Sequence, residues 1–146
     1  MPTGARLVAA LGLAFLGLIV SGQVILLYPE ATDFGWFTTI NTALGLLVGW
    51  QTLGPRAGRG AAVAITNGIT GAVVLLFWAL FVQAVNEMVR LAMANRYDGP
   101  LEALVAVFEI GVGFFLRIAT PGILVTLAIG GVIVSLAAEA AARRWR

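Results

Sequence analysis

The stretch PGILVTLAIGGVIVSLAAEAAARRWR, residues 121–146, is apolar up to about residue 142 and then ends in a cluster of arginines. A helix needs about 20 largely apolar residues to cross a hydrocarbon core of about 30 Å. Arginine is enriched in the cytoplasmic segments that flank such helices. The stretch therefore predicts a transmembrane helix whose C-terminal end lies in the cytoplasm.

The composition of the whole chain also indicates a membrane protein. Of the 146 residues, 60% are hydrophobic and 11% are charged, and the mean hydropathy is +0.98. These values leave too few polar side chains to cover a soluble surface, so the lipid bilayer must solvate most of the exterior. We expect one all-α transmembrane domain over residues 1–146. A formal charge of only +2 gives no reason to expect nucleic acid as a partner.

Further apolar segments, separated by polar turns rich in glycine and proline, precede the final one. We expect four membrane-spanning helices, at residues 7–28, 36–53, 61–93 and 121–142. The segment at 101–117 is helical in pattern but short, and it carries Glu102, Glu109 and Arg117. We expect this amphipathic helix to lie at the outer interface or to be partly re-entrant, and not to be a fifth span.

The arginines orient this four-helix arrangement. One side receives most of them, namely Arg6, Arg56, Arg59, Arg143, Arg144 and Arg146. The other side receives Arg90 and Arg96 together with most of the acidic residues. The arginine-rich side is expected to be cytoplasmic, with both termini on it. A fifth span at 101–117 would move the arginine tail outside.

Four charged residues near the outer end of the third span could meet in space. Glu87 and Arg90 are three residues apart, a spacing at which helical side chains can pair. A hairpin between the third span and the 101–117 helix would bring Glu109 and Arg117 toward them. The sequence leaves two interpretations open for Glu87, Arg90, Glu109 and Arg117: a solvated interfacial ion pair, or an outward polar pocket in which all four converge.

Uncharged polar residues also occur inside the apolar segments. They are Asn41, Asn67, Gln83 and Asn86. Amides exposed to lipid would leave donors and acceptors unpaired, so we expect these side chains to face other helices and hold them together. The alternative is a path for a small polar solute.

Small residues recur at four-residue spacing in two of the predicted spans. Gly45 and Gly49 form a GxxxG pattern in the second, and Gly68 and Ala72 repeat small-xxx-small spacing in the third. Such patterns allow helix backbones to approach closely.

Catalytic chemistry is not expected. The chain contains no cysteine and no histidine, which removes thiol redox steps and the commonest metal ligands. No phosphate-binding loop, dinucleotide fingerprint, nucleophile elbow or zinc-protease motif is found in the sequence. We expect no enzymatic activity, no metal site and no cofactor.

Several segments together resemble one family. They are residues 2–17 (PTGARLVAALGLAFLG), 32–50 (TDFGWFTTINTALGLLVGW), 56–60 (RAGRG), 81–110 (FVQAVNEMVRLAMANRYDGPLEALVAVFEI) and 140–146 (AAARRWR). They resemble the TrgA family, small bacterial inner-membrane proteins named from a tellurium-resistance locus of phototrophic bacteria. The resemblance implies a place in the bacterial inner membrane and an association with tellurite resistance, and it supplies no reaction and no catalytic residues.

Two functions of different kinds fit these observations. The first is a transport or permeability role, which four helices would fulfil as a homo-oligomer with the site at the shared interface. The second is a non-catalytic accessory subunit of a larger respiratory or photosynthetic membrane complex, which would explain why no cofactor ligands are present.

Overall fold

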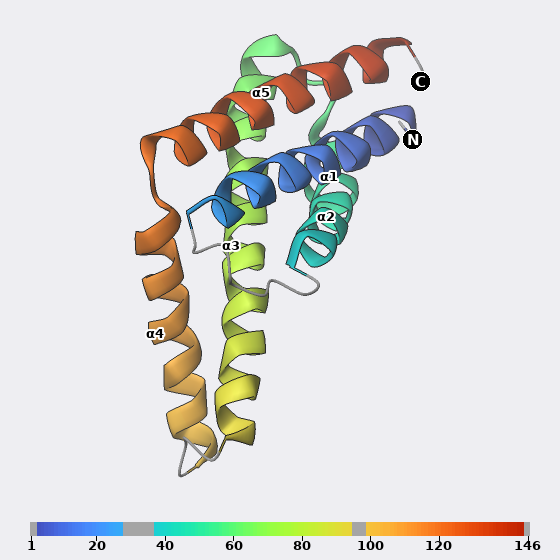
Figure 1. Ribbon diagram of the computed structural model, residues 1–146. Coiled ribbons are helices and arrows are strands. Elements are labelled where there is room, and N and C mark those ends of the chain that lie inside the picture. Colours follow the sequence, from blue (N-terminus) through green and yellow to red (C-terminus); the bar gives the residue numbers. More distant parts are fainter. Residues whose placement is uncertain (1–2, 28–36, 95–98, 145–146) are drawn as a thin grey trace.

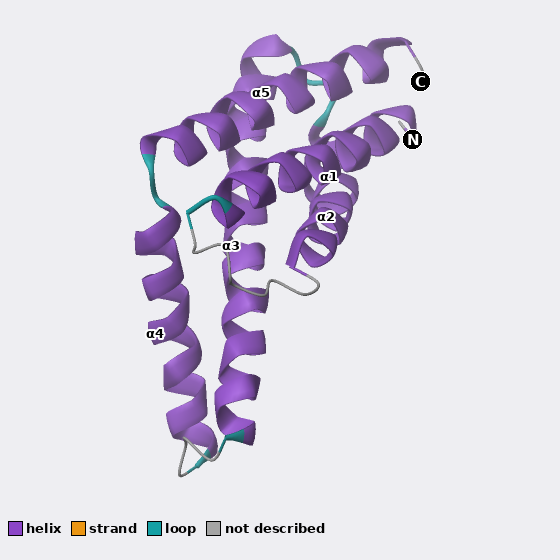
Figure 2. Cartoon of the chain, in the orientation of Figure 1, coloured by secondary structure: helices purple, strands orange, loops and turns teal. Residues whose placement is uncertain are grey.

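The computed structural model describes residues 3–27, 37–94 and 99–144, and over these residues the chain is helical, with no strand (Figures 1 and 2). The α-helices are α1 (Thr3–Ile25), α2 (Phe37–Val48), α3 (Ala61–Met93), α4 (Pro100–Ile118) and α5 (Pro121–Arg144). The predicted all-α class is thereby confirmed for the described residues. Mutual packing of the helices forms one hydrophobic core, centred on Leu13, Leu53 and Leu75.

The second predicted helix, at 36–53, is divided in the structure. Its α-helical part ends at Val48, a π-helical turn covers Gly49–Leu53, and a 3₁₀ turn covers Gly54–Arg56. The N–H of Gly54 bonds to the carbonyl of Gly49, five residues back, and Pro55 has no N–H with which to resume the α-helical pattern. Helical backbone therefore continues from 37 to 56, although α2 itself is short.

The first helix begins earlier than expected, at Thr3 and not at residue 7, and it ends at Ile25. The residues between Thr3 and Leu7 include alanine and arginine, both good helix formers, and no proline, so hydropathy alone places this boundary too late. Residue 28, the expected end, lies outside the described residues.

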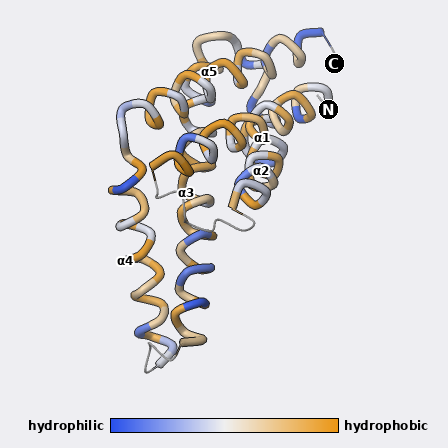
Figure 3. The backbone as a smooth tube through the Cα atoms, viewed as in Figure 1, coloured by the Kyte–Doolittle hydropathy of each residue, from blue (hydrophilic) through white to orange (hydrophobic). Residues whose placement is uncertain are grey.

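Three of the helices are long and apolar enough to cross a membrane: Gly4–Ile25, Ala61–Met93 and Pro121–Arg144. Their outward surfaces carry large apolar side chains, including Phe15, Phe77 and Ile133, which are about 60% exposed. Figure 3 shows apolar residues along most of these helices and polar residues in the second half of α3. Such surfaces suit contact with lipid.

The helices form two parts that share α3. α1 packs between α2 and α5, and α5 crosses the first half of α3, while α4 folds back against the second half of α3 as an antiparallel hairpin (Figure 1). The two ends of the chain lie at the same end of the α1–α5 pair. All five α-helices approach one another at a place that lies away from these ends.

Glycines set the distance between the packed helices. A Cβ atom at Gly45 or Gly49 would overlap with the backbone of α1, at Leu13 and Ala9 respectively. Between α3 and α5, a Cβ at Gly68 would lie 2.5 Å from the carbonyl oxygen of Gly131. A Cβ at Gly131 would in turn lie 3.0 Å from that of Ala72. Both small-residue patterns therefore lie at contacts between helices of the same chain.

Candidate functional site

A chain of polar side chains links three helices where they converge. The Asn41 amide nitrogen donates a hydrogen bond to Ser21 Oγ at 3.0 Å, and Gln83 Nε2 donates to Asn41 Oδ1 at 3.3 Å. Ser21 and Asn41 are buried, with 1% and 7% of their surfaces exposed, so these bonds compensate for lost hydration. Asn41 and Gln83 thus face other helices, whereas Ser21 did not stand out in the sequence because a single hydroxyl in an apolar run is unremarkable.

A cavity of about 310 Å³ adjoins this chain of polar side chains. Its walls are mostly apolar and come from all five α-helices, with Phe37 from α2 and Phe114 and Ile118 from α4. The polar side chains that line it are Ser21, Asn41, Gln83, Asn86 and Glu87. Asn86 is exposed, so the cavity reaches the surface beside it.

The cavity occupies one half of the helix bundle. It lies beside the second half of α1, the beginning of α2 and the beginning of α5, and therefore away from both chain ends. In the other half, the glycine contacts hold α1 against α2, and α3 against α5, at backbone distance. None of the glycines in these contacts, Gly45, Gly49, Gly68 and Gly131, lines the cavity.

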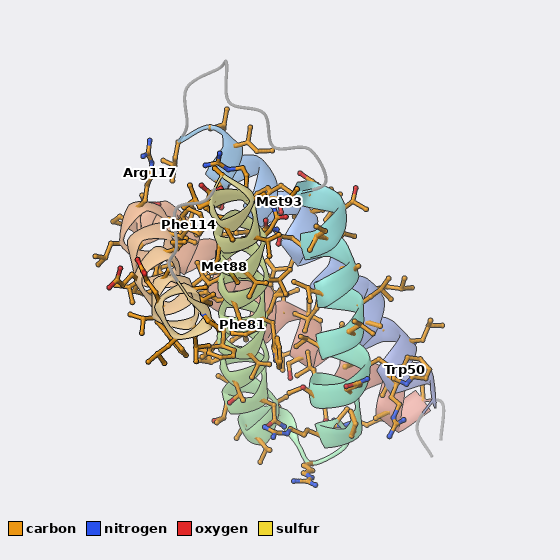
Figure 4. The ribbon with its side chains drawn as sticks, turned by 90° about the horizontal axis from the view of Figure 1, so that it is seen from below. Trp50, Phe81, Met88, Met93, Phe114 and Arg117 are labelled. Atoms are coloured by element: carbon orange, nitrogen blue, oxygen red, sulfur yellow. The ribbon has the colours of Figure 1, made fainter. Side chains whose placement is uncertain are left out.

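The structure brings together two of the four predicted charged residues. Arg90 Nε donates to Glu87 Oε2 at 3.0 Å, and the two side chains form an ion pair on α3. Only Glu87 of the four lines the cavity; Glu109 and Arg117 have exposed side chains on α4, and Figure 4 shows Arg117 at the outer edge of that helix. Of the two interpretations left open, the ion pair therefore describes Glu87 and Arg90. The face of α4 that meets α3 is an apolar one, with Ala106 and Val107.

Two predicted amides differ in role. Asn67 bonds to a turn and not to another α-helix: its side-chain nitrogen donates to the carbonyl of Arg56 at 3.3 Å and so fastens the 3₁₀ turn to the beginning of α3. It lies less than two turns from the start of α3, near the polar loop, where a backbone carbonyl is within reach. Asn86 is exposed at the surface end of the cavity.

A buried carboxylate at the opposite end of the bundle was not singled out in the sequence. Glu139 of α5 accepts hydrogen bonds from the backbone N–H groups of Gly58, at 2.5 Å, and Gly60, at 2.9 Å. Arg143 Nε also donates to it, at 3.3 Å. The side chain is only 6% exposed, so these three donors replace the water that the carboxylate has lost.

The loop that holds Glu139 depends on its glycines. Gly58 and Gly60 have φ angles of +98° and +106°, in the left-handed region that other residues rarely adopt. Successive backbone N–H groups in such turns form an anion-binding concavity. The loop joining the 3₁₀ turn to α3 is therefore fastened to the last part of α5.

Helix α1 is held at the same end of the bundle. The guanidinium carbon of Arg6 lies 5.9 Å from the centroid of the Trp50 ring, within the range of a cation–π contact. Tryptophan and arginine are common at membrane–water interfaces. This end therefore combines a tryptophan with the arginines of three different segments.

The described residues contain no candidate site for a metal ion. Within the ranges that the structure describes, no group of three or more acidic, histidine or cysteine side chains could hold a metal ion. Comparison with protein-family models, curated proteins and solved structures finds no match to this chain. The site must therefore be interpreted from its own geometry.

Proposed function

We propose that the chain is a four-span protein of the bacterial inner membrane, with both termini in the cytoplasm and the α3–α4 hairpin on the outer side. The fourth span is α2 together with the π and 3₁₀ turns, which give helical backbone from 37 to 56. Support comes from the arginines at the beginning of α1, in the loop held by Glu139 and at the end of α5. Helix α4, with Glu102, Glu109 and Arg117 among exposed apolar residues, suits the outer interface.

The length of α3 also fits this arrangement. Its 33 residues correspond to about 50 Å, which exceeds a hydrocarbon core of about 30 Å. Its second half carries Gln83, Asn86, Glu87 and Arg90, and it packs against α4. This half would emerge on the outer side, where polar side chains meet water and headgroups.

Within this membrane arrangement, the function that the site supports best is that of a non-catalytic accessory subunit of a larger respiratory or photosynthetic complex. The observation that carries this proposal is the close packing of the helices beyond the cavity. Gly45 and Gly49 bring α2 against the backbone of α1, and Gly68 and Gly131 bring α3 against α5, in a part of the bundle whose contacts do not line the cavity. The tellurite resistance implied by the resemblance to the TrgA family would then be indirect, through the electron flow and integrity of the membrane.

Direct handling of an oxyanion is poorly supported by the charges at the cavity. Glu87 is the charged side chain in its lining, and Arg90 is already paired with it. An anion entering beside Asn86 would meet a neutralised ion pair and no free guanidinium in the described lining. We therefore expect Arg90→Ala and Arg117→Ala to leave tellurite tolerance unchanged in cells that lack the native protein. A loss of tolerance in both variants would favour direct anion handling.

The second candidate is a transport or permeability role as a homo-oligomer. One observation favours it: the cavity reaches the outer surface beside Asn86, as the entrance of a solute route would. The remainder of the route would run between copies, since α1 packs on α2, and α3 on α5, at backbone distance beyond the cavity.

Affinity purification from native membranes in a mild detergent separates these two functions. The accessory role predicts that a larger complex is recovered with the tagged chain in fixed stoichiometry, identified by mass spectrometry and particle sizing. A preparation that contains only monomers or homo-oligomers contradicts the accessory role. A tagged membrane protein of similar size, expressed at the same level, serves as the control for non-specific recovery.

A further inference from the structure

We propose that the cavity binds the ring of an uncharged, membrane-soluble carbonyl compound of the quinone type, whose apolar tail remains in the bilayer. This inference goes beyond the accessory role and does not depend on it, because binding can be measured on the purified chain alone. It is drawn from three properties of the cavity: its hydrogen-bond donors, its walls and its charge.

The donors are the amides on one wall. The Asn41 side chain uses one N–H on Ser21, and Gln83 uses one N–H on Asn41. Each amide nitrogen carries two N–H groups, so each retains one that has no partner among the described residues. Gln83 is only half-buried and lines the cavity, so its remaining N–H is available to a carbonyl oxygen of a ligand. Asn86, three residues further along α3 at the surface end of the cavity, offers a second amide to the ligand.

The walls suit a flat apolar ring. Phe37 and Phe114 line the cavity from α2 and α4, and Figure 4 shows Phe114 on the side of α4 that is turned toward α3. Aromatic side chains stack favourably on planar rings. Leu76, Leu80 and neighbouring aliphatic residues supply the rest. A volume of about 310 Å³ falls at the lower end of the range for small-molecule pockets, which fits a ring head group but not a whole lipid.

The charge excludes ionic head groups. The Glu87–Arg90 ion pair is neutral overall, so the described lining offers neither a free guanidinium to an anion nor a free carboxylate to a cation. An uncharged head group with acceptor oxygens is the class that remains. The cavity lies between membrane helices and reaches the surface beside Asn86, so a ligand dissolved in the bilayer can leave its tail outside.

Binding of decylubiquinone to the full chain in detergent micelles tests the proposal, with native mass spectrometry to count bound molecules. We expect saturable binding of one molecule per chain. Decylbenzene, which has a ring and the same tail but no carbonyl groups, serves as the control ligand and is expected to bind at least about 10-fold more weakly, since it forms no hydrogen bonds.

Two variants locate the site. Gln83→Leu removes the donor and should weaken decylubiquinone binding by about 2- to 10-fold, the range for one hydrogen bond. Gln51→Leu, at an exposed position remote from the cavity, makes the same chemical change and should have no effect. Ala79→Phe fills part of the cavity and should abolish binding. If the Ala79→Phe variant does not fold, the difference in decylubiquinone affinity between Gln83→Leu and Gln51→Leu still tests the proposal.

Three results would overturn the proposal. They are the absence of saturable decylubiquinone binding, equal binding of decylbenzene, and equal affinity in Gln83→Leu and Gln51→Leu. A failure of the accessory role would be seen in a different experiment, namely in which proteins are recovered with the chain from native membranes.

Discussion

The contact between Glu139 and the Gly58–Gly60 loop makes the most specific prediction about stability. We consider Glu139→Gln, which preserves the size of the side chain. Glutamine keeps one acceptor oxygen, but its NH₂ group cannot accept the second glycine N–H. One backbone donor next to a nearly buried side chain is then left without a partner, and the remaining hydrogen bonds lose their ionic assistance.

The expected magnitude follows from these bonds. A hydrogen bond to a charged group contributes about 1.5–3 kcal/mol, and an uncharged bond contributes about half as much. Losing one backbone bond and weakening the other sums to about 2–4 kcal/mol, and the bond from Arg143, whose side chain is 60% exposed, adds little. Burying a neutral amide costs less than burying a carboxylate, which offsets part of the loss. We therefore expect Glu139→Gln to lower the free energy of unfolding by about 2 kcal/mol.

The assay is equilibrium unfolding in mixed micelles with increasing SDS, followed by far-ultraviolet circular dichroism. The matched control is Glu109→Gln, an exposed position on α4, which should change stability by less than about 0.5 kcal/mol. Because the chain has no cysteine, Arg59→Cys can report on the loop, and its labelling should be faster in the Glu139→Gln background. Equal stability of the Glu139→Gln and Glu109→Gln variants would refute the reasoning.

Two further predictions concern helix packing. Gly49→Leu forces a side chain into the backbone of α1 at Ala9 and should destabilise the protein by about 3 kcal/mol or more in the same SDS titration, whereas Gly113→Leu, where a Cβ has open space, should be tolerated. Asn41→Leu removes both of its hydrogen bonds and leaves Ser21 unpaired, so a loss of about 1–3 kcal/mol is expected. A Gly49→Leu variant as stable as Gly113→Leu, or an Asn41→Leu variant as stable as the parent, would show that these contacts do not form.

Local sequence signals were sufficient for most of the helices. The third span was expected at 61–93 and α3 covers Ala61–Met93, because a long apolar run lies between two groups of helix breakers. The α-helical part of the second span ends at Val48, before the expected end at residue 53, because hydropathy continues smoothly through Gly49–Leu53 while the hydrogen bonding changes to the π pattern. Hydropathy indicates which residues can be buried in lipid, but it does not indicate with which carbonyl a backbone N–H forms its hydrogen bond.

Long-range polar contacts were harder to anticipate. Gly58 and Glu139 are 81 residues apart, and neither residue alone indicates the other, although a lone acid in an apolar span is a signal that some partner exists. The sequence likewise left open whether Glu109 and Arg117 would converge with Glu87. The hairpin was expected, but the rotation of α4 about its axis, which decides the face turned toward α3, depends on packing of small apolar residues such as Ala106.

The membrane arrangement is the central claim, and cysteine accessibility in spheroplasts tests it most directly. Single substitutions Met93→Cys, Arg59→Cys and Arg144→Cys would be exposed to a membrane-impermeant maleimide before and after lysis. The four-span arrangement predicts labelling of Met93→Cys in intact spheroplasts, and labelling of the other two only after lysis. Labelling of Arg144→Cys before lysis would show that α4 crosses the membrane and would contradict the account.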